Sequence, residues 1–130
     1  MDDVSVWAVL AAGLANFAIG GLWYGVLFTN PWKREVGVPD DAQPGSVVKE
    51  LVYSVLLCLV MAVFLAPFIG NEGIGFGTFA GFASGAGFIA PTIAQNYVFE
   101  GKSPRLFAIN AGYSVVAFTV MGAIIGAIQA

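Results

Sequence analysis

Hydrophobic positions along the chain fall into four long runs, at about residues 4–28, 47–69, 74–99 and 106–128. Each run has roughly the 20 residues that a helix needs to cross the hydrocarbon layer of a bilayer. Lys49 and Glu50 are the only charged residues in them, and both lie at an end of a run. The runs also lack the alternation of apolar and polar residues that the strands of a barrel would show. The pattern therefore predicts four membrane-spanning helices.

Polar residues, prolines and glycines mark the ends of these runs. Ser103 and Pro104 predict an N-cap followed by proline at the first position of the last helix. Residues 30–37 predict a short interfacial helix, and residues 71–73 predict a tight turn. We therefore expect an all-α integral membrane four-helix bundle built from two helical hairpins, in a single transmembrane domain that comprises residues 1–130.

The composition supports a membrane environment. Of the 130 residues, 58% are hydrophobic and 10% are charged, whereas roughly 25% of the residues in soluble domains are charged. A soluble protein of this size could not bury so much apolar surface in one core. The lipid bilayer is therefore the expected partner. Nucleic acid is excluded, because the chain carries no basic run.

The basic residues are sorted by segment. They flank the first and third connections, whereas the N-terminus, the middle turn and the C-terminus carry none. Basic connections are typical of the cytoplasmic side, so we expect both termini to be extracytoplasmic, in a multi-pass protein of the cell membrane. Glu100 is expected to be a solvated turn residue on the cytoplasmic side. The cytoplasmic charges are thus Lys33, Arg34, Lys49, Glu100, Lys102 and Arg105.

Glycines repeat every four residues on three of the predicted helices. Such a stripe lets another helix approach closely, either within one bundle or between subunits. The sequence leaves both alternatives open. Because four helices leave much surface facing lipid, we expect a homo-oligomer, or docking on another membrane protein. The third helix has the longest repeat, Gly73, Gly77, Gly81 and Gly85, and shorter pairs are Gly21 with Gly25 and Gly122 with Gly126.

Uncharged polar residues gather at one depth, in the cytoplasmic third of the predicted helices. They either bond one another across helices, each bond contributing about 0.6–2 kcal/mol, or line a cytoplasm-facing cavity that binds a small solute. The dry alternative is favoured, because no charged intramembrane residue marks a pathway. Together with one residue nearer the middle of the first helix, Asn16, this polar cluster comprises Ser54, Thr92, Gln95, Asn96, Asn110 and Ser114.

Residues that could carry chemistry are few. The chain has no histidine, which removes imidazole metal sites and Ser-His or Cys-His dyads. No phosphate-binding, dinucleotide-binding or metalloprotease motif is present. We therefore expect no enzymatic activity, no cofactor and no metal.

Two motifs point to a family. Asn16 is followed by Leu-Trp-Tyr-Gly at 22–25, and Phe-Glu-Gly-Lys-Ser at 99–103 is followed by Ile-Asn-Ala-Gly-Tyr at 109–113. Together they resemble the uncharacterised family called domain of unknown function 1761, small proteins with four predicted membrane helices. The resemblance covers nearly the whole chain and implies that fold, but no activity or substrate. The family often has a histidine after the last tyrosine, where this chain has Ser114, so no histidine-based role is implied here.

Two hypotheses of function follow from these features. The first is a non-enzymatic, oligomeric solute- or ion-permeation unit with a polar cytoplasmic vestibule. The second is a structural or accessory subunit that packs against itself or another membrane protein through its glycine-rich helix faces.

Overall fold

The structure, a computed structural model, describes residues 4–36 and 48–130 and is helical throughout its regular elements. Four spans are long and apolar enough to cross a membrane, Val6–Leu27, Val48–Ile69, Ile74–Glu100 and Pro104–Gln129, which confirms the four predicted helices. The predicted end of the interfacial helix at Gly37 lies outside the described residues. In chain order the elements are α1 (Val6–Leu22), η1 (Trp23–Leu27), α2 (Thr29–Val36), α3 (Val48–Ile69), α4 (Ile74–Ser84), η2 (Gly85–Ile89), α5 (Ala90–Glu100) and α6 (Pro104–Gln129).

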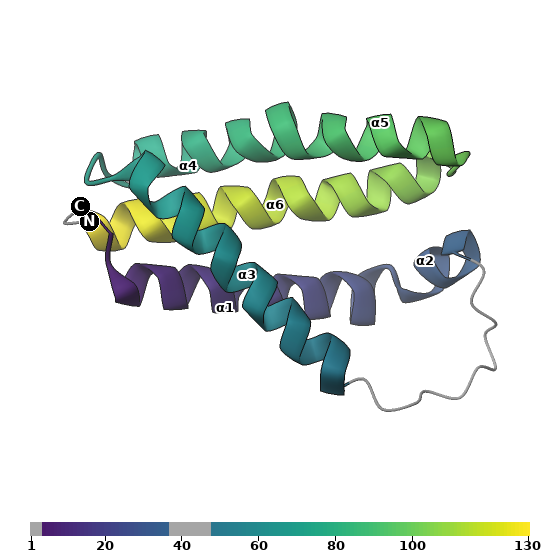
Figure 1. Cartoon of the computed structure of the whole chain (residues 1–130), viewed down its shortest axis with the longest axis horizontal. Helices are drawn as coiled ribbons and strands as arrows, with labels where there is room; N and C mark the ends of the chain where they lie inside the picture. The colour runs from purple at the N-terminus through teal and green to yellow at the C-terminus, as the bar shows by residue number, and fades with distance from the viewer. Residues whose placement is uncertain (1–3, 37–47) are drawn as a thin grey trace.

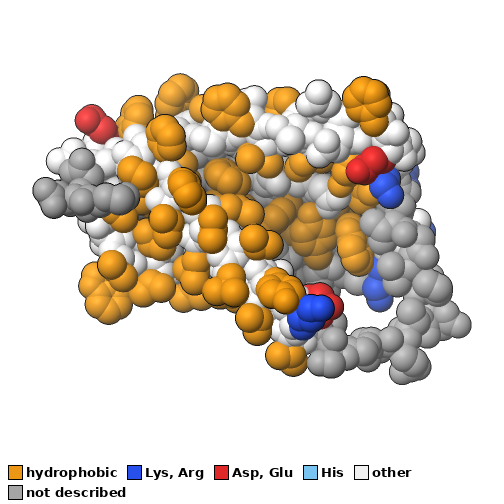
Figure 2. Space-filling view, viewed as in Figure 1, with side chains coloured by type: hydrophobic (Ala, Val, Ile, Leu, Met, Phe, Trp, Pro, Cys, Tyr) orange, Lys and Arg blue, Asp and Glu red, His pale blue; other side chains and the backbone are white. Residues whose placement is uncertain are grey.

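Helix α6 is the centre of the arrangement. The span α4–η2–α5 lies along one side of α6 and α1 lies along the other, while α3 crosses them obliquely (Figure 1). Of the four spans, α6 is the most buried. The start of α1 and the end of α6 lie at one end, and α2 and the turn between α5 and α6 lie at the other, which we call the basic end (Figure 1). Figure 2 shows hydrophobic side chains over the middle of the molecule and charged side chains near its ends.

The buried core sits in the half of the bundle away from the basic end. Helices α1 and α3 meet there through alanines, which let the two backbones come close. At the crossing, a Cβ added to Gly13 would lie 2.6 Å from Cδ2 of Leu59. The side chains that α6 adds to this core are larger. The residues of this core with no exposed surface are Ala8 and Ala12 of α1, Ala62 and Ala66 of α3, and Met121 and Ile125 of α6.

The glycine repeat of α4 packs against α6 within the chain. A Cβ added to Gly77 would lie 2.2 Å from the carbonyl oxygen of Gly122, and one added to Gly81 would lie 2.0 Å from that of Phe118. In the other direction, a Cβ on Gly126 would lie 2.4 Å from the carbonyl oxygen of Gly73. Of the two alternatives for this stripe, the structure therefore shows close packing inside one bundle.

The predicted turn and cap are both confirmed. The Ser103 hydroxyl accepts a hydrogen bond from the backbone N–H of Leu106 at 3.0 Å, and Pro104 is the first residue of α6. Between α3 and α4 the chain turns through Gly70 and Gly73, whose φ angles are +56° and +101°. These are left-handed conformations, which favour glycine.

Two spans contain a π-helical turn. In η1 the N–H of Phe28 bonds to the carbonyl of Trp23 at 2.8 Å, and in η2 the N–H of Ala90 bonds to the carbonyl of Gly85. Each bond spans five residues instead of four, which inserts one extra residue into the helix. Because η2 ends two residues before Pro91, which lacks an N–H, the irregularity lies where the α-helical ladder would lose a bond anyway. The helix continues beyond it to Glu100.

Gln129 joins three helices at the end opposite the basic one. Its Oε1 accepts a hydrogen bond from the backbone N–H of Ser5 at 2.9 Å. Its Nε2 donates to the carbonyl oxygens of Ala66 and Gly70, at 3.1 and 2.8 Å. The side chain thus satisfies backbone groups at the start of α1 and the end of α3, a role that the sequence analysis did not predict.

Candidate functional site

A groove lies between the first span and α3, in the basic half of the bundle. We call it the α1–α3 groove; its volume is about 470 Å³. Gly21 and Gly25 were predicted to pack against a helix, but no helix of the described chain packs on them, since a Cβ added at either position would meet nothing within 4 Å. Instead they line the groove, which stays open there because neither has a side chain. The groove is lined by Phe17, Gly20, Gly21, Tyr24 and Gly25 of the first span, Leu51, Ser54, Leu57, Cys58 and Met61 of α3, and Tyr113 of α6.

Asn16 lies next to the deep end of this groove and is only 1% exposed. Its Nδ2 donates weak hydrogen bonds to the Sδ atoms of Met61 and Met121, at 3.5 and 3.6 Å. Its Oδ1 accepts a short hydrogen bond from the Tyr113 hydroxyl. All of its polar atoms are therefore satisfied by protein groups, and the cluster separates the groove from the alanine-lined core.

Asn110 is the centre of a second hydrogen-bonded cluster. The Tyr24 hydroxyl donates to its Oδ1 at 2.6 Å, and its Nδ2 donates to the Tyr97 hydroxyl at 2.5 Å. One carboxamide thus links the first, third and fourth spans. The sequence analysis did not single out these tyrosines as partners of Asn110. A signal was present, since Tyr24 and Tyr97 precede Pro31 and Pro104 by the same interval.

Aromatic side chains hold η1 and α2 against α6. The indole Nε1 of Trp23 donates to the carbonyl oxygen of Ile109 at 2.9 Å, and the ring centroids of Trp23 and Phe28 are 4.9 Å apart. The ring of Tyr24 meets those of Tyr113 and Trp32 edge-on, with centroids 5.4 and 5.9 Å apart. These contacts fix the position of the Tyr24 hydroxyl beside Asn110.

The structure separates the remaining members of the polar cluster. Thr92, Gln95 and Asn96 are exposed on the outer face of α5, and the Thr92 hydroxyl bonds to the carbonyl oxygen of Phe88 on its own helix at 2.6 Å. They are not brought to Asn110, whose amide instead bonds to tyrosines. Ser54 lines the α1–α3 groove, and Ser114 is half-buried on α6.

The charged residues singled out in the sequence lie at the basic end. Lys33 is half-buried and the others are exposed. The ammonium group of Lys49 lies 5.8 Å from the centre of the Tyr53 ring, a cation–π contact at the start of α3.

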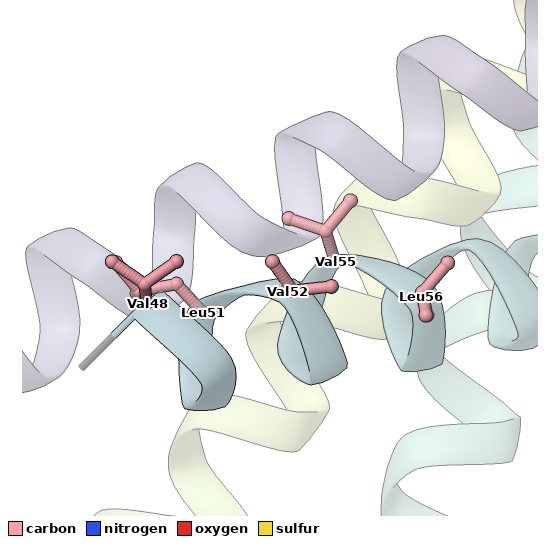
Figure 3. Close-up of a pocket in the computed structure, with 5 residues that line it drawn as sticks. All are labelled: Val48, Leu51, Val52, Val55 and Leu56. Carbon is pink, nitrogen blue, oxygen red and sulfur yellow. The ribbon is translucent and has the colours of Figure 1, made fainter. Parts of the chain in front are cut away.

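A second, shallower recess runs along α3. It has a volume of about 320 Å³, and Figure 3 shows the five α3 side chains that line it. All five are aliphatic, so the recess offers no polar group to a ligand. Leu51 lines both this recess and the α1–α3 groove. The lining residues are Val48, Leu51, Val52, Val55 and Leu56.

The chemistry that the α1–α3 groove offers is uncharged. Its lining supplies tyrosine and serine hydroxyls, a thiol, a thioether and ring faces. In residues 4–36 and 48–130, no three side chains of the His, Cys, Asp or Glu types come together as a metal site would require. The groove is therefore suited to hold a small neutral molecule by contact and hydrogen bonding.

Comparison with known proteins gives one match. No curated protein and no solved structure matches the chain. The family described as "Protein of unknown function (DUF1761)" matches residues 7–126, which include both hydrogen-bonded clusters and the whole of the α1–α3 groove. This match confirms the resemblance drawn from the sequence motifs. The chain is a multi-pass membrane protein that belongs to the DUF1761 family.

Proposed function

We propose that this protein is a non-enzymatic permeation unit for small uncharged solutes, and that the α1–α3 groove is its binding chamber. The observation that carries the proposal is the groove itself. At about 470 Å³ it falls within the roughly 300–1,000 Å³ range of small-molecule sites, and its lining mixes ring faces with hydroxyls. A groove that only contacted lipid acyl chains would gain nothing from these hydroxyls, because acyl chains form no hydrogen bonds.

The class of solute follows from the lining. No residue around the groove is charged, so an ion would lose its hydration without gaining a counter-charge. The hydroxyls of Tyr24 and Tyr113 already donate to Asn110 and Asn16, but their oxygens retain acceptor capacity. A neutral solute with hydroxyl or amide donors matches these acceptors.

The proposed orientation places the basic end in the cytoplasm of a cell whose plasma or inner membrane holds the protein. Positively charged connections are retained on that side, so the groove would face the cytoplasm. Asn16, Met61 and Tyr113 close its deep end. In this proposal the structure corresponds to an inward-open state, and passage requires these side chains to move apart.

Solute flux into proteoliposomes tests this proposal. Glycerol and urea serve as probes, with shrinkage and re-swelling followed by stopped-flow light scattering. Gly21→Leu and Gly25→Leu place a side chain in the groove, and its Cβ would meet nothing within 4 Å at either position, so we expect folded proteins whose flux falls to that of protein-free vesicles. Gly75→Leu is the matched control, because that position is equally open but lies outside the groove. Wild-type flux no greater than that of protein-free vesicles, or equal flux in all variants, would refute the proposal.

A second candidate function, that of a subunit docking on another membrane protein or on a second copy, is favoured by the outer face of α5. Gln95 and Asn96 are exposed there at membrane depth, on one stripe with Phe99, which is 86% exposed. Carboxamides facing lipid lack partners, and amides on a second helix supply both donors and acceptors. A second copy is the simplest such partner.

Self-association is tested by the mass of the purified protein in detergent. If α5 forms the contact, Gln95→Leu combined with Asn96→Leu shifts the protein from dimer to monomer. The control is Ser54→Leu, which removes an exposed polar group from α3 instead. A wild-type protein that is monomeric at all concentrations would rule out the second copy.

A further inference from the structure

We infer that Arg34 and Arg105 form a binding site for the phosphate headgroup of an anionic phospholipid at the basic end. Both side chains are exposed, and both line a hollow of about 410 Å³ that shares no residue with the α1–α3 groove. Its other lining residues are Phe28, Pro31, Ala108 and Ile109.

Two elements far apart in the chain bring the guanidinium groups to this hollow. Arg34 lies in the last turn of α2, and Arg105 is the second residue of α6. The position of α2 is fixed by the contacts of η1, in which the indole of Trp23 bonds to the Ile109 carbonyl at 2.9 Å and packs on Phe28. These contacts fix the shape of the hollow, and none of them involves the two arginines.

The electrostatics of the hollow select an anion. Guanidinium groups present planar sets of donors that match phosphate oxygens. Arg105 also lies in the first turn of a 26-residue helix, where the helix dipole favours negative charge. Lys33, in the last turn of α2, and Lys102, between α5 and α6, lie at the same end and add to the positive potential, which Glu100 at the end of α5 offsets only in part. Basic pockets between membrane helices are a recurring site for acidic headgroups.

The apolar part of the lining selects a lipid over a free anion. Phe28, Pro31 and Ala108 lie beside the arginines and offer apolar surface that a hydrated phosphate ion would leave unused. An acyl chain running from the headgroup along α6 covers this surface, so phosphate and chain are bound together. Because a lipid is held in the membrane next to the hollow, its effective concentration there is also high.

Lipid binding to the purified full-length protein in a neutral detergent tests the inference. Dioleoyl phosphatidylglycerol, dioleoyl phosphatidylcholine and inorganic phosphate are added separately, and bound lipid is counted by native mass spectrometry while thermal unfolding is followed. We expect phosphatidylglycerol to remain bound and to raise Tm, with phosphatidylcholine and phosphate much weaker. Arg34→Gln and Arg105→Gln are each expected to lower the apparent affinity about five- to tenfold, as the loss of one interfacial cation implies.

Lys49→Gln is the matched control, since it removes one positive charge from the same end but lies outside the hollow. It should bind phosphatidylglycerol as the wild type does. If a Gln variant is poorly folded without lipid, Arg34→Lys and Arg105→Lys keep the charge and are expected to bind with intermediate affinity. Equal binding of the two lipids, or an equal loss in Lys49→Gln, would overturn the site. Full competition by inorganic phosphate would overturn its assignment to lipid.

Discussion

Adding one methyl group at Gly77 tests whether the glycine stripe determines the contact between α4 and α6. The new Cβ would lie 2.2 Å from the carbonyl oxygen of Gly122, whereas ordinary van der Waals contact begins at 3.4 Å. The obstructing atom belongs to the backbone and cannot rotate away. In Gly77→Ala the two helices must therefore separate locally by about 1.2 Å, the difference between these distances.

The cost of this separation follows from the packing it removes. A gap of about 0.5–1 Å already forfeits a quarter to a half of each dispersion contact, and overpacking of this kind costs about 1–3 kcal/mol. Gly75, two residues earlier on the same helix, has nothing within 4 Å of an added Cβ. Gly75→Ala is expected to raise the free energy of unfolding by about 0.5–1 kcal/mol, because alanine restricts the unfolded chain.

The matched pair is compared by unfolding in detergent micelles with increasing denaturant, followed by tryptophan fluorescence and circular dichroism. We expect the midpoints of the two variants to shift in opposite directions from the wild type. Gly122→Ala should be as harmful as Gly77→Ala, because its Cβ would lie 2.0 Å from the Gly77 carbonyl oxygen, and the double variant should cost less than the sum. If Gly77→Ala is as stable as Gly75→Ala, the close approach of α4 and α6 is refuted.

Three further predictions concern orientation and the polar clusters. A periplasmic reporter fused after Ala130 should be active and one inserted at 40–45 silent; the reverse activities would invert the proposed orientation. Gln129→Leu leaves the Ser5 N–H and the Gly70 carbonyl without their partner, whereas the Ala66 carbonyl keeps its bond from the Gly70 N–H, so the free energy of unfolding should fall by about 1–3 kcal/mol. Thr78→Val, which removes only a hydrogen bond within α4, is the tolerant control. Asn110→Leu leaves two tyrosine hydroxyls without their amide and should destabilise by a similar amount; stability equal to that of Thr78→Val would show that this cluster contributes nothing.

The spans, the cap and the turn could be predicted from the sequence because each depends on local chemistry. A run of about 20 apolar residues has one stable form in lipid, and Ser103 followed by Pro104 has one favoured place in a helix. The family resemblance rested on motifs of the same local kind, and the match over residues 7–126 confirms it.

Which face of each helix turns inward could not be predicted in the same way. In a soluble protein, polar residues indicate which face of a helix points outward. In a membrane helix both faces are apolar, so the few polar residues do not indicate its orientation. Asn110 and Asn96 looked alike in the sequence, yet one is enclosed by tyrosines and the other is exposed. The role of Gln129 depends on where the last turn of α3 ends, which no pattern near Gln129 reveals.

The central place of α6 has a consequence for how the protein is made. Synthesis proceeds from the N-terminus, so α6 is the last of the four spans to enter the membrane. The first span and α3 pack on each other and can pair as soon as both are inserted. The third span makes its main contact with α6. Its row of glycines, which exposes the backbone, therefore faces lipid until the fourth span is inserted. During biogenesis this third span is therefore the segment most open to capture by an insertion chaperone or a membrane protease.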